Sequence, residues 1–91
     1  MKSIAIRIKQ SRELKGLSQK ELADKIGVSS SAISQYESTS YFHSEPSVKN
    51  LIKLTKVLNV SFEWLATGRG IREIEDFLLN EKNTYKDDNR L

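Results

Sequence analysis

Residues 18–37 constrain the fold of this chain more than any other part, because they contain signals for two successive helices with a glycine between them. Ser18 with Glu21 three residues later has the spacing of a capping box, which predicts a helix beginning at Gln19. Gly27 is placed to end this helix, because glycine adopts the left-handed conformation that closes helices at little cost. One short helix and a sharp turn are therefore predicted.

A second helix is predicted directly after this turn, because Ser29 can cap it. Ala23 in the first helix is a small residue at a position where two crossing helices touch. Ile33 is apolar at a position on the buried side of the second helix. Two short helices that meet at a tight turn in this way form a helix-turn-helix.

Together with the stretch from Val60 to Gly68, the residues from Leu17 to Gln19 and from Ile33 to Glu37 resemble the Cro and phage-repressor type of helix-turn-helix protein, the XRE-like transcriptional regulators. The resemblance covers roughly residues 4 to 68. It implies an all-α fold, a compact five-helix domain like that of lambda repressor. It also implies a sequence-specific DNA-binding transcriptional regulator of the phage or prophage repressor kind, which binds a palindromic operator as a homodimer through residues 18–37.

Three further helices are predicted around this motif from serine caps and from apolar residues at helical spacing. They are expected to start after Ser3, after Ser47 and at Ser61, and to end at Gly16, Asn59 and Ala66. The apolar residues expected to face the core from these helices are Ile4, Ile8, Leu14, Val48, Leu51, Leu54 or Thr55, Leu58 and Trp64. In the first helix the apolar positions alternate with Arg7, Lys9, Arg12 and Lys15, and in the fourth helix Lys49, Lys53 and Lys56 form the opposite stripe. The run 38–46 has no helical period and many turn formers, which predicts a surface loop.

Charge is unevenly distributed along the 91 residues. Residues 1–70 contain 11 Lys and Arg against 6 Asp and Glu, a balance of +5, whereas residues 71–91 contain 4 against 6, a balance of −2. We expect a helix-turn-helix DNA-binding domain over 1–70 and a C-terminal helix with a polar tail over 71–91. A basic domain suits a phosphate backbone, because lysine and arginine release counterions from nucleic acid.

The composition argues against several other classes of protein. The chain has no cysteine, one histidine and only scattered single glycines, so zinc sites, disulfides and phosphate-binding glycine loops are not expected. No nucleophile, base and orienting group can be nominated, which predicts a non-enzyme without metal or cofactor. No unbroken apolar run could cross a membrane, and the first residues lack a secretory signal. We expect a cytoplasmic protein, bacterial or phage-encoded.

The second helix of the motif is the candidate recognition helix, since such a helix fits the major groove of DNA and its N-terminal residues face base edges. The residues expected to point outward and to contact bases are Ser30, Ser31, Ser34 and Gln35. The resemblance matches Ser30, Ser31 and Gln35 to base-contacting positions of phage repressors. Gln35 is the main candidate, because an amide can bond adenine bidentately whereas serine discriminates weakly. The alternative is an ordinary polar helix face.

A second set of residues is expected to contact the DNA backbone: Gln19, Ser18, Ser29, Arg12, Tyr41, His43 and Lys49. The resemblance places Gln19 against a phosphate, where the N-terminus of a helix also favours an anion. The others have structural alternatives. Ser18 and Ser29 can act as caps alone. By resemblance Arg12 forms an ion pair with Glu37, and the aromatic residues of the loop can instead anchor it to the domain.

Apolar residues beyond the fifth predicted helix point to contacts with a partner. Ile71, Ile74, Phe77 and Leu78 can line one side of a sixth helix. One interpretation is homodimerisation through this stripe, and the other is packing against its own domain. A function of another class also stays open: an antitoxin or other protein-interaction module, which binds a toxin or regulatory protein and for which DNA binding is secondary.

Overall fold

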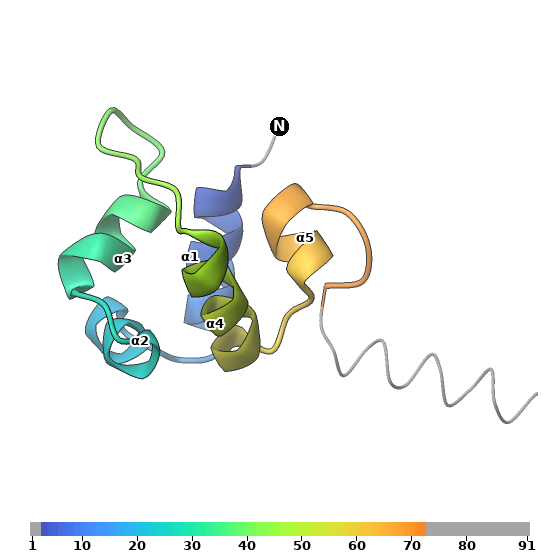
Figure 1. Cartoon of the computed structure of the whole chain (residues 1–91), viewed down its shortest axis with the longest axis horizontal. Helices are drawn as coiled ribbons and strands as arrows, with labels where there is room; N and C mark the ends of the chain where they lie inside the picture. Colours follow the sequence, from blue (N-terminus) through green and yellow to red (C-terminus); the bar gives the residue numbers. More distant parts are fainter. Residues whose placement is uncertain (1–2, 73–91) are drawn as a thin grey trace, which may run out of the picture.

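The computed structural model describes residues 3–72, which form five helices and, within that range, no β-sheet (Figure 1). The helices are α1 (Ile4–Leu14), α2 (Gln19–Ile26), α3 (Ser30–Glu37), α4 (Val48–Leu58) and α5 (Phe62–Thr67). The expected all-α, five-helix fold is confirmed. Most of the predicted C-terminal helix and tail, from residue 73 onward, lies outside the described residues.

Serine caps set the start of every described helix, as predicted. Each cap's Oγ accepts a hydrogen bond from the backbone N–H three residues later, and the caps are Ser3, Ser18, Ser29, Ser47 and Ser61. Gly27 ends α2 and Asn59 ends α4 in the left-handed conformation, with φ of 77° and 58°. α5 begins and ends one residue later than predicted.

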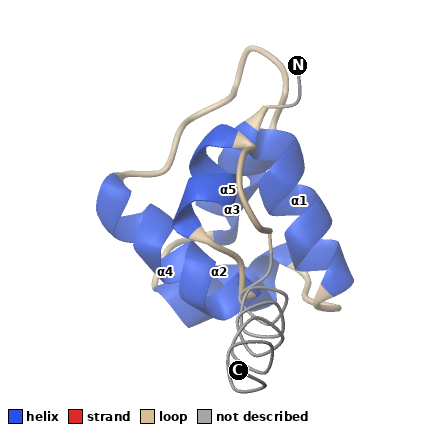
Figure 2. Cartoon of the chain, turned by 90° about the vertical axis from the view of Figure 1, so that its right-hand side faces the viewer, coloured by secondary structure: helices blue, strands red, loops and turns tan. Residues whose placement is uncertain are grey.

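Every helix contributes at least one fully buried aliphatic residue, so the five helices share a single core. Examples, one from each helix, are Ile8, Leu22, Ile33, Leu54 and Leu65. α2 packs against α3 and α4, while α1 packs against α3 and α5 (Figure 2). This packing places α2 and α3 on one side of the domain and α5 on the other (Figure 1).

Two of the predicted core positions are wrong. Leu14 and Val48 are largely exposed. Leu14 is the last residue of α1 and Val48 the first of α4, and both extend past the packed part of the bundle. Helical spacing identifies the side of a helix that faces the core, but it does not show where along the helix the packing ends.

Arg7, one of the basic residues that alternate with the apolar positions of α1, is buried. Its Nε donates to the carbonyl of Leu65 at 2.9 Å, and its Nη2 donates to the carbonyl of Ala66 at 3.3 Å. These carbonyls belong to the last turn of α5, where helical carbonyls lack partners within the helix. Burial lowers the pKa of Arg7. The guanidinium therefore fastens α1 to the C-terminal end of α5.

The chain folds back after α5 and is held at the N-terminal end of that helix. The backbone N–H of Ser61 donates to the carbonyl of Arg72 at 2.8 Å, and its Oγ donates to the carbonyl of Ile71 at 2.6 Å. The guanidinium of Arg72 lies over the half-buried ring of Trp64, 6.0 Å from its centroid. Ile71 is exposed and belongs to no helix.

We predict that Arg7→Met lowers the free energy of unfolding by about 2 kcal/mol, because the carbonyls of α5 lose a charged hydrogen-bond donor while most of the aliphatic stem is kept. Lys9→Met removes an exposed charge from the same helix and should change this free energy by less than about 0.5 kcal/mol. Urea unfolding followed by circular dichroism measures both. Equal effects of the two substitutions would contradict the role assigned to Arg7.

Candidate nucleic-acid interface

α3 has one structural face and one outward face. Ile33, Tyr36 and Glu37 are buried against the other helices. The exposed residues lie on a separate arc of the helix and are Ser30, Ser31, Ser34 and Gln35. None of these four side chains has a hydrogen-bond partner within residues 3–72. The four predicted base contacts thus share one polar surface that takes no part in internal bonding.

The turn between α2 and α3 fixes the direction in which this surface points. The N–H groups of Gly27 and Val28 both donate to the carbonyl of Ala23, at 2.9 and 3.0 Å. Ser29 then caps α3 by accepting from the N–H of Ala32 at 3.0 Å. Ser29 therefore acts as the helix cap, which was the structural alternative to a DNA contact. Its hydroxyl hydrogen can still be donated to a ligand.

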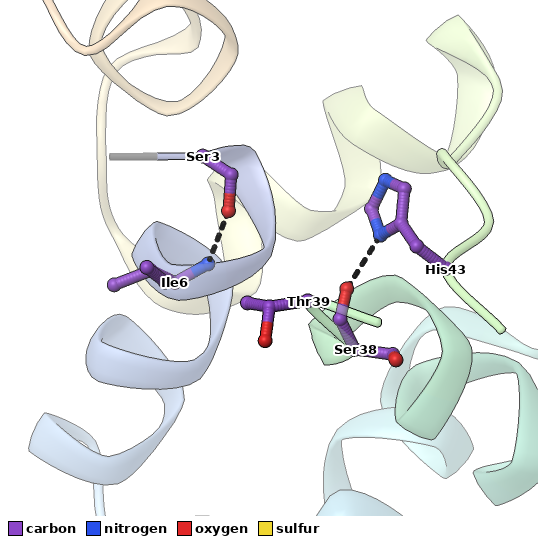
Figure 3. Close-up of a pocket in the computed structure, with 5 residues that line it drawn as sticks. All are labelled: Ser3, Ile6, Ser38, Thr39 and His43. Atoms are coloured by element: carbon purple, nitrogen blue, oxygen red, sulfur yellow. Dashed lines mark hydrogen bonds between the residues drawn. The ribbon is translucent and has the colours of Figure 1, made fainter. Parts of the chain in front are cut away.

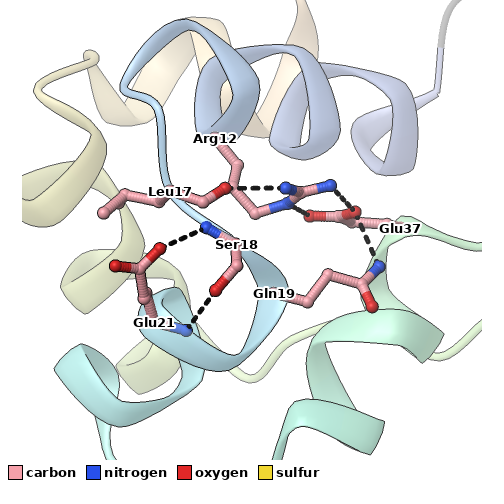
Figure 4. A network of polar contacts seen from close by, with 6 residues as sticks. All are labelled: Arg12, Leu17, Ser18, Gln19, Glu21 and Glu37. Atoms are coloured by element: carbon pink, nitrogen blue, oxygen red, sulfur yellow. Dashed lines mark hydrogen bonds and ion pairs between the residues drawn. The ribbon is translucent and has the colours of Figure 1, made fainter.

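A buried carboxylate joins α3 to α1 and α2 (Figure 4). Glu37 accepts from Nε and Nη2 of Arg12, at 2.6 and 3.0 Å, and from Nε2 of Gln19 at 3.1 Å. The predicted ion pair between Arg12 and Glu37 is confirmed, with side-chain exposures of 11% and 3%. The bond from Gln19 had no signal in the sequence. Glu37 therefore ties the C-terminal end of α3 to the N-terminal end of α2.

Arg12 is committed to structural contacts. Its remaining guanidinium nitrogen, Nη1, donates to the carbonyl of Leu17 at 2.7 Å (Figure 4). The hydrogen bond with Glu37 raises the pKa of Arg12, so the group is charged at any physiological pH. All three guanidinium nitrogens are engaged. Direct contact of Arg12 with a DNA backbone stays a prediction, and it would use a largely buried side chain.

The first turn of α2 has two backbone donors that the cap does not use. In the capping box, the N–H of Ser18 donates to Oε1 of Glu21 at 2.8 Å and the N–H of Glu21 donates to Oγ of Ser18 at 3.0 Å. The bond that the carboxylate accepts from the backbone of Ser18, together with the Ser18 side chain, lowers the pKa of Glu21. The two unused donors are the N–H groups of Gln19 and Lys20, which have no acceptor within the helix. The amide of Gln19 also keeps one N–H beyond the one given to Glu37.

The loop between α3 and α4 does not use Tyr41 or Phe42 as an anchor. Tyr41 is 94% exposed and Phe42 is 74% exposed, so the alternative in which they pack on the domain is wrong. His43 is half-buried, and its Nδ1 lies 2.8 Å from the carbonyl of Ser38. Because a carbonyl only accepts, this nitrogen donates, and Nε2 of the neutral ring is left as a hydrogen-bond acceptor.

The same histidine helps to line a pocket between the loop and the first turn of α1 (Figure 3). The other lining residues are Ser3, Ile6, Ser38 and Thr39. The polar groups of this pocket are hydroxyls and one imidazole.

Residues 3–72 contain no group of three or more His, Cys, Asp or Glu that could hold a metal ion. In the same range, none of the helices has the length and apolar character needed to cross a bilayer.

The start of α4 is fastened to α3 by a bond that sequence patterns do not reveal. Nδ2 of Asn50 donates to the hydroxyl of Tyr36 at 3.1 Å. Lys49, the neighbouring predicted backbone contact, is exposed in the first turn of α4. Of the predicted dimerisation residues, Ile71 is exposed, and Ile74, Phe77 and Leu78 lie outside the described residues.

A helix-turn-helix family model matches residues 8–65, more than half of the chain. The SPβ prophage-derived uncharacterized HTH-type transcriptional regulator YonR of Bacillus subtilis is 35% identical over 78 residues, which cover 86% of this chain and 69% of YonR. Among solved structures, the P22 c2 repressor in complex with a synthetic operator is similar at a TM-score of 0.69 and 33% identity. This match covers 76% of this chain and 100% of that one.

SinR of Bacillus subtilis is similar in two complexes. In complex with DNA it has a TM-score of 0.57 and 43% identity, and the match covers 68% of this chain and 95% of SinR. In complex with SinI it has a TM-score of 0.62 and 34% identity, and the match covers 90% of this chain and 80% of that one.

We predict that Glu37→Ala lowers the free energy of unfolding by about 3 kcal/mol, because it leaves the largely buried charge of Arg12 without its carboxylate. Glu45→Ala removes an exposed carboxylate from the loop and should change this free energy by less than about 0.5 kcal/mol. Thermal and urea unfolding of both variants test this. A loss below 1 kcal/mol for Glu37→Ala, which is the range of exposed pairs, would contradict it.

The lowered pKa of Glu21 predicts a specific dependence of stability on pH. A group whose pKa is depressed on folding stabilises the folded state above its unfolded pKa, and this contribution is lost as pH falls through the folded pKa. The stability difference between the wild type and Glu21→Gln should therefore be largest near neutral pH and shrink below the usual glutamate value of 4.5. Urea unfolding from pH 7 down to about pH 3 measures it. A difference that stays constant over this range would contradict the prediction.

Proposed function

Because this chain belongs to the helix-turn-helix family of DNA-binding transcriptional regulators, we propose that it is a repressor that recognises an operator with α3 in the major groove. The observation that carries the proposal is the arc of polar side chains on α3 that has no internal partner. The major groove admits one α-helix, and the outer face of that helix meets the base edges. The family is one of DNA-binding regulators, and we propose no catalytic role.

Direct base recognition falls mainly to Gln35. Its amide can donate to and accept from the N7 and N6 groups of one adenine, whereas a serine hydroxyl discriminates poorly between bases. Ser30, Ser31 and Ser34 bring the backbone of α3 close to the groove floor and bond base edges or bridging waters. Specificity then depends on few direct contacts and on the shape of the DNA.

Backbone positioning falls to the first turn of α2. The positive end of the α2 dipole, the N–H groups of Gln19 and Lys20 and the second amide hydrogen of Gln19 converge on one phosphate. Ser18 and Ser29 add hydroxyl donors next to their capping roles. Arg12 acts through Glu37, which holds Gln19 in place.

Further phosphate contacts come from the loop and from α4. Tyr41 carries a hydroxyl donor on the loop, next to the ring of His43, and Lys49 carries a charge on the first turn of α4. The excess of basic residues in the domain supplies the salt-dependent part of binding. Such contacts hold the domain in register but carry no sequence information.

We propose that two copies bind a palindromic operator with half-sites about one helical turn, ~34 Å, apart. Dimerisation through Ile71, Ile74, Phe77 and Leu78 is the corresponding proposal for the C-terminal segment. As a bacterial or phage-encoded regulator of transcription, the protein would act in the cytoplasm, where the DNA is.

A second candidate function is binding of a regulatory or toxin protein, with DNA binding secondary. The similarity to SinR in complex with SinI supports it, because SinR in that structure is bound to another protein. A protein that copurifies with the full chain and prevents its binding to DNA would support this function.

Selection of bound sequences from random duplexes tests the proposed function. Gln35→Ala should relax the preference at one base position by about 1–3 kcal/mol, since it removes one bidentate contact. Gln19→Ala should weaken binding to all sequences similarly, because a phosphate carries no sequence information. Gln10→Ala, an exposed glutamine on α1, is the matched control and should change neither.

The dependence of affinity on salt completes this test. The wild-type affinity for the selected duplex should fall as salt concentration rises, because cationic side chains displace counterions. A wild-type protein with no sequence preference and no salt-dependent affinity would overturn the proposed function.

A further inference from the structure

The loop between α3 and α4 carries two aromatic side chains at its tip. The N–H of His43 donates to the carbonyl of Ser40 at 3.0 Å, which closes a turn with Tyr41 and Phe42 at its centre. The two rings meet edge to face, with centroids 5.6 Å apart and planes at 86°. Both are mostly exposed, so this pair, the aromatic tip, is an apolar surface that the described domain leaves uncovered.

Hydrogen bonds within the loop hold the aromatic tip in a fixed relation to α3. The hydroxyl of Ser38 accepts from the N–H of Ser40 at 3.2 Å, and the carbonyl of Ser38 accepts from His43 Nδ1 at 2.8 Å. The N–H of Ser44 donates to the carbonyl of Gln35 at 3.1 Å. The part of the loop that follows the tip is thus bonded, through the N–H of Ser44, to the backbone of Gln35, the residue proposed to recognise a base.

The position of the loop suggests what covers the aromatic tip. In Figure 1 the loop projects beyond the end of α3, on the side of the domain away from α5. α3 has 8 residues and is about 12 Å long, which is about the width of the major groove. With α3 directed across the groove, a loop held past the end of this helix would reach the rim, where the deoxyriboses border the minor groove.

The chemistry of the loop is not that of an ionic contact. Residues 38–47 contain no Lys or Arg and one carboxylate, Glu45. The loop cannot release counterions through lysine or arginine as the rest of the domain can. Aromatic rings instead pack on sugars and bases, and apolar side chains insert between base steps in the minor groove.

We propose that Tyr41 and Phe42 pack against deoxyriboses and base edges of the minor groove next to the major groove occupied by α3. The aromatic tip adds affinity that does not depend on salt, and it favours sequences whose minor groove accepts the rings. This inference rests on the proposed DNA-binding function and adds a second contact surface to it.

The test compares Tyr41→Ser/Phe42→Ser with Phe62→Ser, which removes an exposed ring from α5 on the other side of the domain. Affinity for the selected duplex is measured by fluorescence anisotropy at several salt concentrations. The double variant should bind about tenfold more weakly at every salt concentration. The slope of log affinity against log salt should be unchanged, and Phe62→Ser should stay within about twofold of the wild type.

Hydroxyl-radical footprinting provides the second readout. Wild type and Phe62→Ser should protect the sugars of the flanking minor groove, and the double variant should lose this protection while it keeps the major-groove selectivity due to Gln35. Unchanged affinity, or a shallower salt slope in the double variant, would overturn the inference. So would a change of oligomeric state without DNA in sedimentation, which would identify the tip as a contact between copies. Failure of the proposed function is distinct, because the wild type itself would then not bind.

Discussion

The carboxylate of Glu37 is the interaction on which the arrangement of the helix-turn-helix depends. It receives Arg12 from α1 and Gln19 from α2 at the C-terminal end of α3. A buried charge is tolerated only with its partners in place, so this network holds three helices in one relative orientation. That orientation sets how far the N-terminus of α2 lies from the outer face of α3, and hence how far a phosphate contact lies from a base contact.

The domain separates residues that maintain the fold from residues available to a ligand. On α3 the buried face does the structural work, through Ile33, Tyr36 and Glu37. The outer face contributes nothing to internal bonding, so substitutions there can change recognition without loss of stability. Gln19 is the exception, since it bonds Glu37 and is also the residue proposed to contact a phosphate. In the proposed complex, a single side chain therefore connects the rigidity of the motif to its contact with the DNA backbone.

Local chemistry made much of this structure predictable from sequence. Caps and left-handed ends, such as Gly27, depend on groups a few residues apart, and the outward face of α3 follows from the helical period. Contacts between distant residues were not predictable from local patterns, and the ion pair of Arg12 with Glu37 was expected only from the family resemblance. Arg7 bonds the carbonyl of a residue 58 positions away, and a carbonyl has no sequence signature. The exposure of Leu14 and Phe42 likewise depends on which neighbours reach them, which spacing alone does not specify.

The small side chains on α3 determine how the proposed complex divides its interactions. Three of the four outward residues are serines, whose single hydroxyls distinguish base pairs weakly. The basic residues of the domain add affinity but no sequence information, because phosphates are the same at every base pair. Discrimination must then come from the amide of Gln35 and from contacts sensitive to the shape of the DNA. The aromatic tip is proposed as such a contact, because its fit would depend on the width of the groove that it meets, and the loop that carries it is bonded to the last turn of α3 through Ser44.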